Sequence, residues 1–224
     1  MTLNNSHLDT VMKRIDSCAV SDAMDRLGIS GVIDGIWSQT GSQHRIAGKV
    51  ITVRVVSRTD DKPRPHLCSG AIMSADPGDV IVVDNGGRLD VSCWGGLLSL
   101  AAAQQQVSGV VLDGACRDVT EAMELGFPVF AKGTIPRTAR GRIVEESFGQ
   151  PVSIRGITVA TGDYVFADST GISFVPQTRI DEVVNLAKLI VDRELEMTKL
   201  VKCGKSIIDV MHDQQFDQIT TDNN

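Results

Sequence analysis

An alternation of apolar runs and helix-forming runs, separated by glycines, constrains the fold of this chain more than any other feature. Residues 79–84 (DVIVVD) and 110–112 (VVL) are short and rich in β-branched side chains, so they predict buried strands. Between them, residues 97–106 (LLSLAAAQQQ) predict a helix that begins just after a pair of glycines. The order of strand, glycine turn, helix, glycine stop and strand indicates a layered α/β fold.

The flanking segments complete the expected fold. Apolar residues at helical spacing predict an amphipathic N-terminal helix (Leu8, Val11, Met12 and Ile15). Ser21 is placed to cap a second short helix, which Gly28 would end. The glycine-containing segments 85–87 and 114–116 predict turns. The other elements are predicted over residues 45–57 (a strand pair or one long bent strand), 118–125 (a helix), 127–131, 151–160, 164–168 and 172–175 (strands) and 178–203 (a long helix with one apolar face).

The composition argues against several classes of partner and compartment. The net charge of −6 provides no basic patch for nucleic acid. No apolar run is long enough to span a membrane, and the N-terminus lacks the apolar segment of a secretory signal. The 5 cysteines are odd in number and scattered without a CxxC motif, which fits a protein of the reducing cytoplasm. No low-complexity linker divides the chain, so we expect a single domain.

Two junctions between a strand and a helix are candidates for a ligand site, because helix N-termini offer free backbone N–H groups. They are residues 93–98 and residues 113–118, and the second presents Arg117 beside Asp118. A guanidinium matches a carboxylate bidentately, so Arg117 can hold the acid group of a substrate. Asp118 can hold Mg²⁺ or Mn²⁺, which would polarise a 2-oxo group and stabilise an enolate. The pair therefore suggests a lyase that acts on 2-oxo acids.

Other interpretations of these residue types remain open. Arg117 and Asp118 also fit a surface ion pair at the start of a helix, with no function in catalysis. Lys132 follows an apolar strand and could form a Schiff base, although a solvated or phosphate-binding lysine is the simpler interpretation. Cys116 lies at a helix start, where a thiolate would be stabilised, but with no evident histidine partner we expect a small packed side chain. The four histidines show no ligand spacing, so we expect no zinc site.

Four segments resemble one known family. They are SDAMDRLG, PGDVIVVDNGG, WGGLLSLAAAQQQVSGVVLDGACRD and GDYVFADSTGISFVP. They closely resemble the RraA-like family, which includes the 4-hydroxy-4-methyl-2-oxoglutarate and 4-carboxy-4-hydroxy-2-oxoadipate aldolases and the regulator of RNase E activity. The resemblance runs over residues 8–204 in the same order, and residues 94–118 are its most specific part. It implies a swivelling β/β/α fold in one domain over residues 1–224, with residues 205–224 as a tail, assembled as a trimer or hexamer with sites at subunit interfaces.

The resemblance also assigns expected roles to individual residues. By position, Asp118 matches the family's metal ligand and Arg117 its pyruvate-binding arginine. The loop whose backbone holds the substrate matches Gly95, Gly96, Leu97 and Leu98. A glutamate in the C-terminal helix of a neighbouring subunit often supports the waters on the metal. Two residues of this chain are candidates for that place, Glu194 and Glu196.

One position departs from the pattern of the family's aldolases. They usually carry Asp or Glu twenty-one positions before the arginine, where this chain has Gly96. The missing carboxylate would orient a water on the metal or shuttle its proton. Either another acid takes its place, with Asp84 and Asp90 the nearest in sequence, or the reaction of this protein differs from those of the known aldolases.

The resulting hypothesis is a Mg²⁺- or Mn²⁺-dependent class II aldolase that cleaves a 4-hydroxy-2-oxo acid and releases pyruvate. Decarboxylation of oxaloacetate passes through the same enolate and is an expected accompanying activity. The alternative is a protein-binding regulator of an RNA-processing enzyme without catalytic activity. The glycine at position 96 mildly favours the regulator, whereas the C-terminal helix extension resembles the aldolase members of the family.

Overall fold

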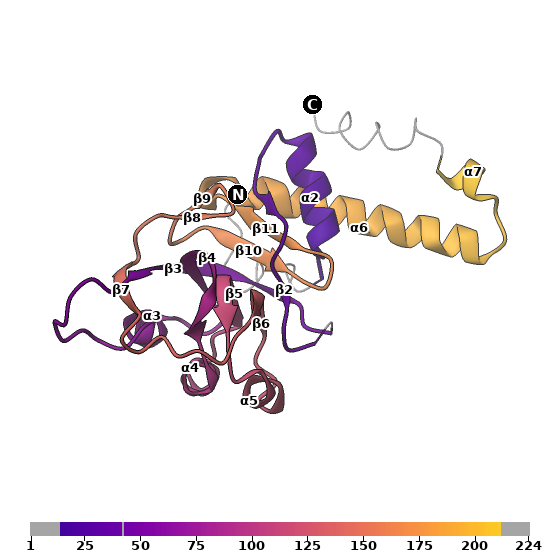
Figure 1. The fold of residues 1–224 in the computed structure, drawn as a ribbon. Coiled ribbons are helices and arrows are strands. Elements are labelled where there is room, and N and C mark those ends of the chain that lie inside the picture. The colour runs from indigo at the N-terminus through magenta and orange to yellow at the C-terminus, as the bar shows by residue number, and fades with distance from the viewer. Residues whose placement is uncertain (1–13, 42, 212–224) are drawn as a thin grey trace.

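A mixed sheet of nine strands forms the centre of the part of the chain that the structure describes (Figure 1). This computed structural model describes residues 14–41 and 43–211. The strands follow the order β1-β11-β10-β3-β4-β5-β6-β2, β7 pairs with β3, and β8 and β9 form a separate hairpin. Their bounds are β1 (Val32–Ile33), β2 (Trp37–Ser38), β3 (Ile46–Ser57), β4 (Val80–Trp94), β5 (Gly109–Cys116), β6 (Val129–Thr134), β7 (Ile143–Phe148), β8 (Val152–Ile154), β9 (Ile157–Val159), β10 (Tyr164–Ala167) and β11 (Ile172–Val175). The helices are α2 (Ser17–Arg26), α3 (Ser69–Ser74), α4 (Gly96–Gln104), α5 (Val119–Glu124), α6 (Ile180–Lys202) and α7 (Ile207–Val210), with a 3₁₀ turn at Gln177–Arg179.

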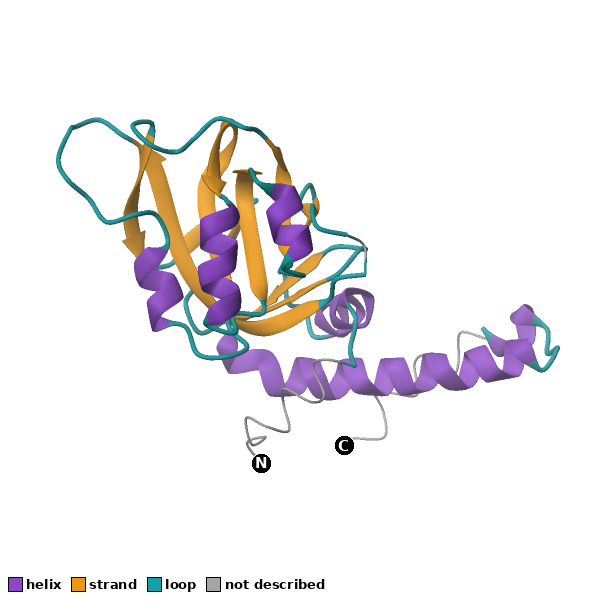
Figure 2. Ribbon diagram, turned by 90° about the horizontal axis from the view of Figure 1, so that it is seen from below, coloured by secondary structure: helices purple, strands orange, loops and turns teal. Residues whose placement is uncertain are grey.

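Strands β3, β4, β5 and β6 run parallel, and α3, α4 and α5 connect them in turn. Every residue of β5 is buried, as expected for a parallel strand that is covered on both faces. Along β4, Ile81 and Val83 join an apolar cluster that includes residues of α4, whereas Val80 and Val82 join a second cluster with β8 and β9. Figures 1 and 2 show α3, α4 and α5 side by side on one face of these strands. The carboxyl ends of β4 and β5 therefore lie beside the N-termini of α4 and α5.

The mixed α/β class predicted from the sequence is confirmed, and the strands differ from the prediction mainly in length. Residues 45–57 form one long strand, as one of the two predicted alternatives has it. The turn predicted at residues 85–87 does not end β4, because the strand continues to Trp94. Its pairing with β5 shifts register after Asp84. The glycines at 86 and 87 have positive φ, so they bend the strand as a bulge does rather than ending it.

The second predicted turn is also wrong. Residues 114–116 belong to β5, because Ala115 and Cys116 pair with Gly133 and Thr134 of β6. Residues 151–160, predicted as one strand, form the β8–β9 hairpin. Its turn contains Arg155 and Gly156, which both have positive φ, as the tight turns of two-residue hairpins require.

Helix α2 begins earlier than predicted. Its N-cap is Asp16, whose Oδ1 accepts the N–H of Ala19 at 2.8 Å, while Ser21 lies inside the helix. Gly28 follows the helix end with a φ of 65°, in the role predicted for it. The predicted helix over residues 8–15 lies almost wholly outside the described residues.

The first half of α6 packs against α2. Ala19, Val20 and Ala23 of α2 share an apolar cluster with Val183 and Ala187 of α6. The second half of α6 extends away from the sheet (Figures 1 and 2). Among the helices that the structure describes, none is long and apolar enough to cross a membrane.

Candidate functional site

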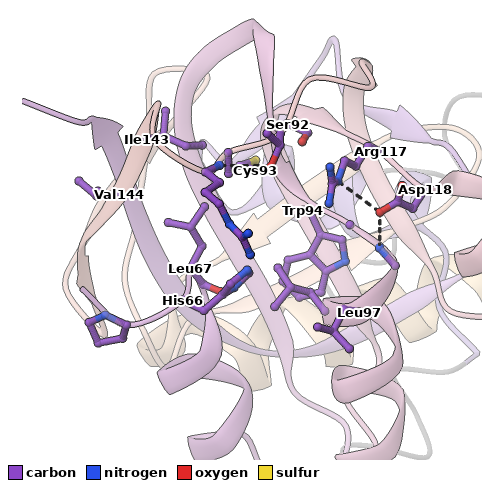
Figure 3. A pocket seen from close by; sticks show the side chains of 18 of the residues that line it. His66, Leu67, Ser92, Cys93, Trp94, Leu97, Arg117, Asp118, Ile143 and Val144 are labelled. Atoms are coloured by element: carbon purple, nitrogen blue, oxygen red, sulfur yellow. Dashed lines mark hydrogen bonds and ion pairs between the residues drawn. The ribbon is translucent and has the colours of Figure 1, made fainter. Parts of the chain in front are cut away.

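A cavity of about 770 Å³ opens where β4 and β5 end and α4 and α5 begin (Figure 3). Its wall includes residues 92–98 and, from the next junction, Arg117, Asp118 and Glu121. The loop before α3 and the loop before β7 complete it. One cavity therefore brings together all the residues predicted for the loop, the arginine and the metal ligand, which are Gly95, Gly96, Leu97, Leu98, Arg117 and Asp118.

Two hydrogen bonds from backbone N–H groups join the two junctions. The Arg117 N–H donates to the carbonyl of Trp94 at 3.0 Å. The Gly96 N–H donates to Oδ2 of Asp118 at 3.1 Å. Asp118 is the N-cap residue of α5 but does not cap its own helix, and it has a left-handed backbone with a φ of 56° and a ψ of 39°. Its conformation thus directs the carboxylate to the start of α4, and two segments separated in sequence form one site.

Arg117 and Asp118 form an ion pair in which the guanidinium Nε lies 3.3 Å from Oδ2. The side chains are 39% and 34% exposed, so both are open to the cavity. Both contacts to the carboxylate use Oδ2, and no described group donates to Oδ1. The two terminal nitrogens of Arg117 likewise have no hydrogen-bond partner among the described residues. Each side chain therefore keeps binding capacity that a ligand can use.

The two glycines at the start of α4 allow this close approach. A Cβ at Gly95 would lie 2.8 Å from Oδ2 of Asp118 and 3.2 Å from Nε of Arg117. A Cβ at Gly96 would overlap the carboxylate of Glu121 and lie 3.3 Å from the Cβ of Asp118. Neither glycine has positive φ, so the crowding around them, rather than backbone conformation, favours the small residue.

The first turn of α4 has one free backbone donor. The N–H groups of Leu98 and Ser99 both donate to the carbonyl of Gly95, each at 3.1 Å. That of Gly96 donates to Asp118. The N–H of Leu97 has no acceptor among the described residues, so it can donate to a bound anion.

The donors present fit a hard divalent ion better than zinc. Within residues 14–41 and 43–211, no group of three or more His, Cys, Asp or Glu is placed to hold a metal. A zinc site needs three or four protein ligands. Mg²⁺ and Mn²⁺ accept one carboxylate with waters and substrate oxygens, and Oδ1 of Asp118 is available for such a bond.

Apolar and thiol side chains form the inner wall. Trp94 is buried, donates its indole N–H to Ser99 Oγ at 2.9 Å and stacks on Phe127. Burial raises the pKa of the Cys93 thiol, which lies in the wall, well above its usual range. Burial also raises the pKa of Cys116 to about 11. Both thiols are therefore protonated at neutral pH, and Cys116 is a packed side chain as predicted.

Basic side chains dominate the rest of the wall. Arg58, Arg64 and Arg140 line the cavity together with His66. Arg64 is paired with Asp60 at 3.0 Å, whereas the guanidinium of Arg140 has no partner among the described residues. With Arg117, the cavity thus contains four arginines and two carboxylates, which favours an acidic ligand.

The two glutamates of the C-terminal helix lie elsewhere in the chain. Glu196 is paired with Lys199 at 2.6 Å. Burial, with a smaller contribution from Asp16 and Asp22, raises the pKa of Glu194. Neither glutamate lines the cavity of its own chain, so their predicted role from a neighbouring subunit stays a prediction.

The two acids nearest in sequence to the missing carboxylate do not supply it. Asp84 accepts the N–H of Gly86, and Asp90 is paired with Arg88 at 3.0 Å. Neither lines the cavity. The acid beside Gly96 is Glu121, which we did not predict from sequence. Its position in the sequence, three residues after Asp118, was the only available signal.

Lys132 is not part of the cavity wall. Its Nζ lies 3.9 Å from Oδ1 of Asp113, and only 20% of its side chain is exposed. Burial raises the pKa of Asp113, and the nearby charge of Lys132 partly offsets this effect. The geometry therefore gives no support to a Schiff-base role for Lys132 in this cavity.

Comparison with known proteins gives a consistent result. The RraA-like family (Aldolase/RraA) matches residues 17–173. Protein DlpA of Legionella pneumophila is 30% identical over 203 residues, which are 91% of this chain, and this chain spans only 33% of that protein's length. A Halalkalibacterium halodurans protein named "Putative 4-hydroxy-4-methyl-2-oxoglutarate aldolase" is 28% identical over 183 residues, 80% of this chain and 81% of that protein.

Solved structures show the same fold. An uncharacterized protein from Pseudomonas syringae pv. tomato superimposes with a TM-score of 0.84 at 29% identity, over 94% of this chain and 99% of that one. Streptomyces coelicolor RraAS2, described as an unusual member of the RNase ES inhibitor RraA family, superimposes with a TM-score of 0.78 over 89% and 99% of the chains. At 24% identity, this second match is evidence for the fold alone.

Proposed function

The chain belongs to the RraA-like family, and from this premise we propose that it is a divalent-metal-dependent aldolase that cleaves a 4-hydroxy-2-oxo acid and releases pyruvate. Relatives named as aldolases support a lyase at the level of the family. The observation that carries the proposal for this chain is the junction of Arg117 and Asp118 in one cavity. There the guanidinium has two free nitrogens and the carboxylate has one free oxygen.

Arg117 holds the C1 carboxylate of the substrate in this proposal. Its terminal nitrogens form a planar fork that matches the two oxygens of a carboxylate. The free N–H of Leu97, at the positive end of α4, donates to the same group. Together these donors place the neighbouring 2-oxo group beside Asp118.

Asp118 would hold the ion, Mg²⁺ or Mn²⁺, through Oδ1. When bound, the ion would supply positive charge for the 2-oxo group and for the enolate that forms as the C3–C4 bond breaks. The Gly96 N–H and Arg117 position the carboxylate through its other oxygen, so it stays oriented before ligands arrive.

The remaining arginines favour a substrate with more than one carboxylate. Arg58, Arg64 and Arg140 lie in the same cavity as Arg117 but on the loops before α3 and β7. A second acid group at the far end of a 4-hydroxy-2-oxo acid would face them. A 2-oxo acid with one carboxylate would leave the guanidinium of Arg140, which has no partner among the described residues, without a counter-charge.

Release of pyruvate with and without EDTA tests the proposal. Purified protein with Mg²⁺ or Mn²⁺ and 4-hydroxy-4-methyl-2-oxoglutarate should release pyruvate, and EDTA should stop the reaction until the ion is restored. Decarboxylation of oxaloacetate is the second substrate test. Turnover that persists in EDTA would contradict metal dependence. The lack of turnover on any 2-oxo acid, together with recovery of a ribonuclease from lysate, would favour the regulator instead.

We also propose a single RraA-like domain, self-association into a trimer or hexamer, and a cytoplasmic location. The match of the family to residues 17–173 supports the first of these. The exposed apolar side chains of α6 and α7 support self-association. The scattered free cysteines support the location.

A further inference from the structure

Glu121 presents a second carboxylate to the cavity, one turn after Asp118 on α5. Both acids lie at the start of α4: Asp118 Oδ2 accepts the Gly96 N–H, and a Cβ at Gly96 would overlap the Glu121 carboxylate. The Glu121 side chain is exposed, and its carboxylate has no hydrogen bond or ion pair with any described residue. Nothing in the part of the chain that the structure describes neutralises this group.

This carboxylate occupies the space that a side chain at position 96 would enter. Gly96 is the first residue of α4 and does not have positive φ, so its backbone conformation would accept other residues. An aspartate would even be favourable there, because the N-terminus of a helix stabilises negative charge. A Cβ at Gly96 would overlap the Glu121 carboxylate, so a larger residue there would turn the Glu121 side chain away from its present place. The absence of a side chain at Gly96 therefore leaves the space that the Glu121 carboxylate occupies.

Cleavage of a 4-hydroxy-2-oxo acid requires a group that accepts the proton of the 4-hydroxyl. The arginines of the cavity remain protonated and cannot do so. The Cys93 thiol is buried and protonated, and Asp118 contacts Gly96 and Arg117 and, in the proposed function, would hold the ion. Two candidates remain among the described residues that line the cavity, His66 and Glu121.

The position of His66 disfavours it. Its Nδ1 lies 3.1 Å from the carbonyl of Leu67, in the loop before α3. In Figure 3 the Trp94 ring lies between His66 and the Arg117–Asp118 pair. Glu121, in contrast, lies beside Gly96, whose N–H donates to the Asp118 carboxylate.

We propose that Glu121 is the residue that accepts the proton of the substrate 4-hydroxyl, which rests on the proposed aldolase function. As the O–H bond breaks, its electron pair forms the new carbonyl at C4, the C3–C4 bond breaks, and that pair forms the enolate of pyruvate. Glu121 then releases the proton to water, and C3 of the enolate takes a proton from water. The reaction needs no further reactant.

The experiment compares two reactions of the same enzyme in the Glu121→Gln variant. Decarboxylation of oxaloacetate gives the same enolate without removing a hydroxyl proton, so only cleavage of the 4-hydroxy acid needs the base. Because a positioned base contributes about 100-fold or more to the rate, the ratio of cleavage to decarboxylation should fall by about 100-fold. Titration with Mn²⁺ in the absence of substrate shows separately whether the Asp118 site is intact. A merely structural role would lower both rates together and leave the ratio at its wild-type value.

A double variant that moves the carboxylate from position 121 to position 96 provides the matched control. In the Gly96→Asp, Glu121→Ala double variant, the new aspartate enters the space that the Glu121 side chain has left. The ratio of cleavage to decarboxylation should therefore be higher in the double variant than in Glu121→Ala alone. An unchanged ratio in Glu121→Gln, or no recovery in the double variant, would overturn the inference and leave the proposed function standing. A wild-type protein that carries out neither reaction would overturn the proposed function and, with it, the inference.

Discussion

The backbone conformation of Asp118 is energetically unfavourable, and the position of this residue in the site explains why it occurs. A left-handed conformation is unfavourable for a residue with a side chain, by roughly 1–2 kcal/mol, although aspartate tolerates it better than most. Here it turns the carboxylate away from its own helix and toward the N–H of Gly96. Strained residues of this kind occur where a site requires them. The strain is thus consistent with a functional role for Asp118 rather than a surface ion pair.

The crowding at Gly95 leads to the first prediction. A methyl group there would lie 2.8 Å from Oδ2 of Asp118, closer than carbon and oxygen pack, so Gly95→Ala should displace the carboxylate without removing any functional group. We expect a loss of Mn²⁺ affinity of about tenfold or more, comparable to the loss of a supporting contact. Titration of the ion measures it. The control is Gly171→Ala, where a Cβ would meet nothing within 4 Å and the φ is not positive. Equal affinities in the two variants would contradict the described geometry.

Arg117→Lys tests the carboxylate fork. Lysine keeps the charge but loses the planar pair of donors, and a hydrogen bond to a charged group contributes about 1.5–3 kcal/mol. The value of kcat/KM for pyruvate release should therefore fall by about 10- to 100-fold, mainly through a higher KM. Steady-state kinetics measure both constants. A KM equal to that of the wild type would show that Arg117 does not bind the substrate.

At the scale of elements, hydrogen bonds to Asp168 hold the start of α2 at the end of β10. Its carboxylate accepts the Ser17 N–H at 2.8 Å, the Ser17 hydroxyl at 2.7 Å and the Thr170 N–H at 2.9 Å. Burial raises the pKa of Asp168, but these hydrogen bonds outweigh it and bring the pKa below its ordinary value. The charged form is therefore the one that the folded state favours.

Asp168→Asn should lower the free energy of unfolding by about 1–3 kcal/mol at pH 7. Because the folded pKa is lowered, the contribution is present above the ordinary pKa of about 3.9 and is lost as the pH falls through the folded value. The difference between variant and wild type should therefore narrow below about pH 4. Urea unfolding at a series of pH values measures it. Asp61→Asn, at an exposed carboxylate without a partner among the described residues, is the control and should have little effect. A difference that does not depend on pH would contradict this account.

The elements that could be predicted from sequence are those with a local signal. The β-branched runs of β3, β4 and β5 and the alanine-rich α4 carry their own propensity, so their existence was predicted correctly. Strand β7 was missed because its polar and apolar residues follow no long pattern, and it is fixed by pairing with β3. The continuation of β4 through Gly86 and Gly87 was missed because the glycines suggest a turn until a neighbouring strand is present.

The candidate site could be predicted where strand ends meet helix starts. The placement of residues 95–98 with Arg117 and Asp118 follows from the parallel order of β4 and β5. Glu121 could not be predicted, because its relation to Gly96 depends on how two helices approach each other. The same limit applies to Arg140, which reaches the cavity through a loop of no regular pattern.

At the scale of the whole molecule, the second half of α6 extends away from the sheet (Figure 2). Several of its apolar side chains are exposed. Leu195 is 54% exposed and Val201 41%, and α7 adds Ile208 at 77%. Exposed apolar surface of this kind commonly marks a protein interface. We therefore place the predicted self-association on this helix.

Light scattering of the Leu195→Glu, Val201→Glu double variant tests this placement. The wild-type protein should have the mass of a trimer or hexamer, and the variant a smaller mass, because two buried charges at an apolar interface are unfavourable. The control is Met73→Glu on α3, which is 74% exposed and far from α6 in sequence. A monomeric wild type, or a variant that keeps the full mass, would contradict the prediction.

The central claim is that the Asp118 carboxylate holds a divalent ion beside an arginine that binds a 2-oxo acid. The most direct test is a paired measurement on wild type and Asp118→Ala, the binding of Mn²⁺ by titration and the release of pyruvate from 4-hydroxy-4-methyl-2-oxoglutarate. We predict that the substitution weakens Mn²⁺ binding by more than about 100-fold, beyond the effect of losing a supporting contact, and abolishes pyruvate release. An Asp118→Ala protein that binds Mn²⁺ and releases pyruvate as the wild type does would contradict the claim.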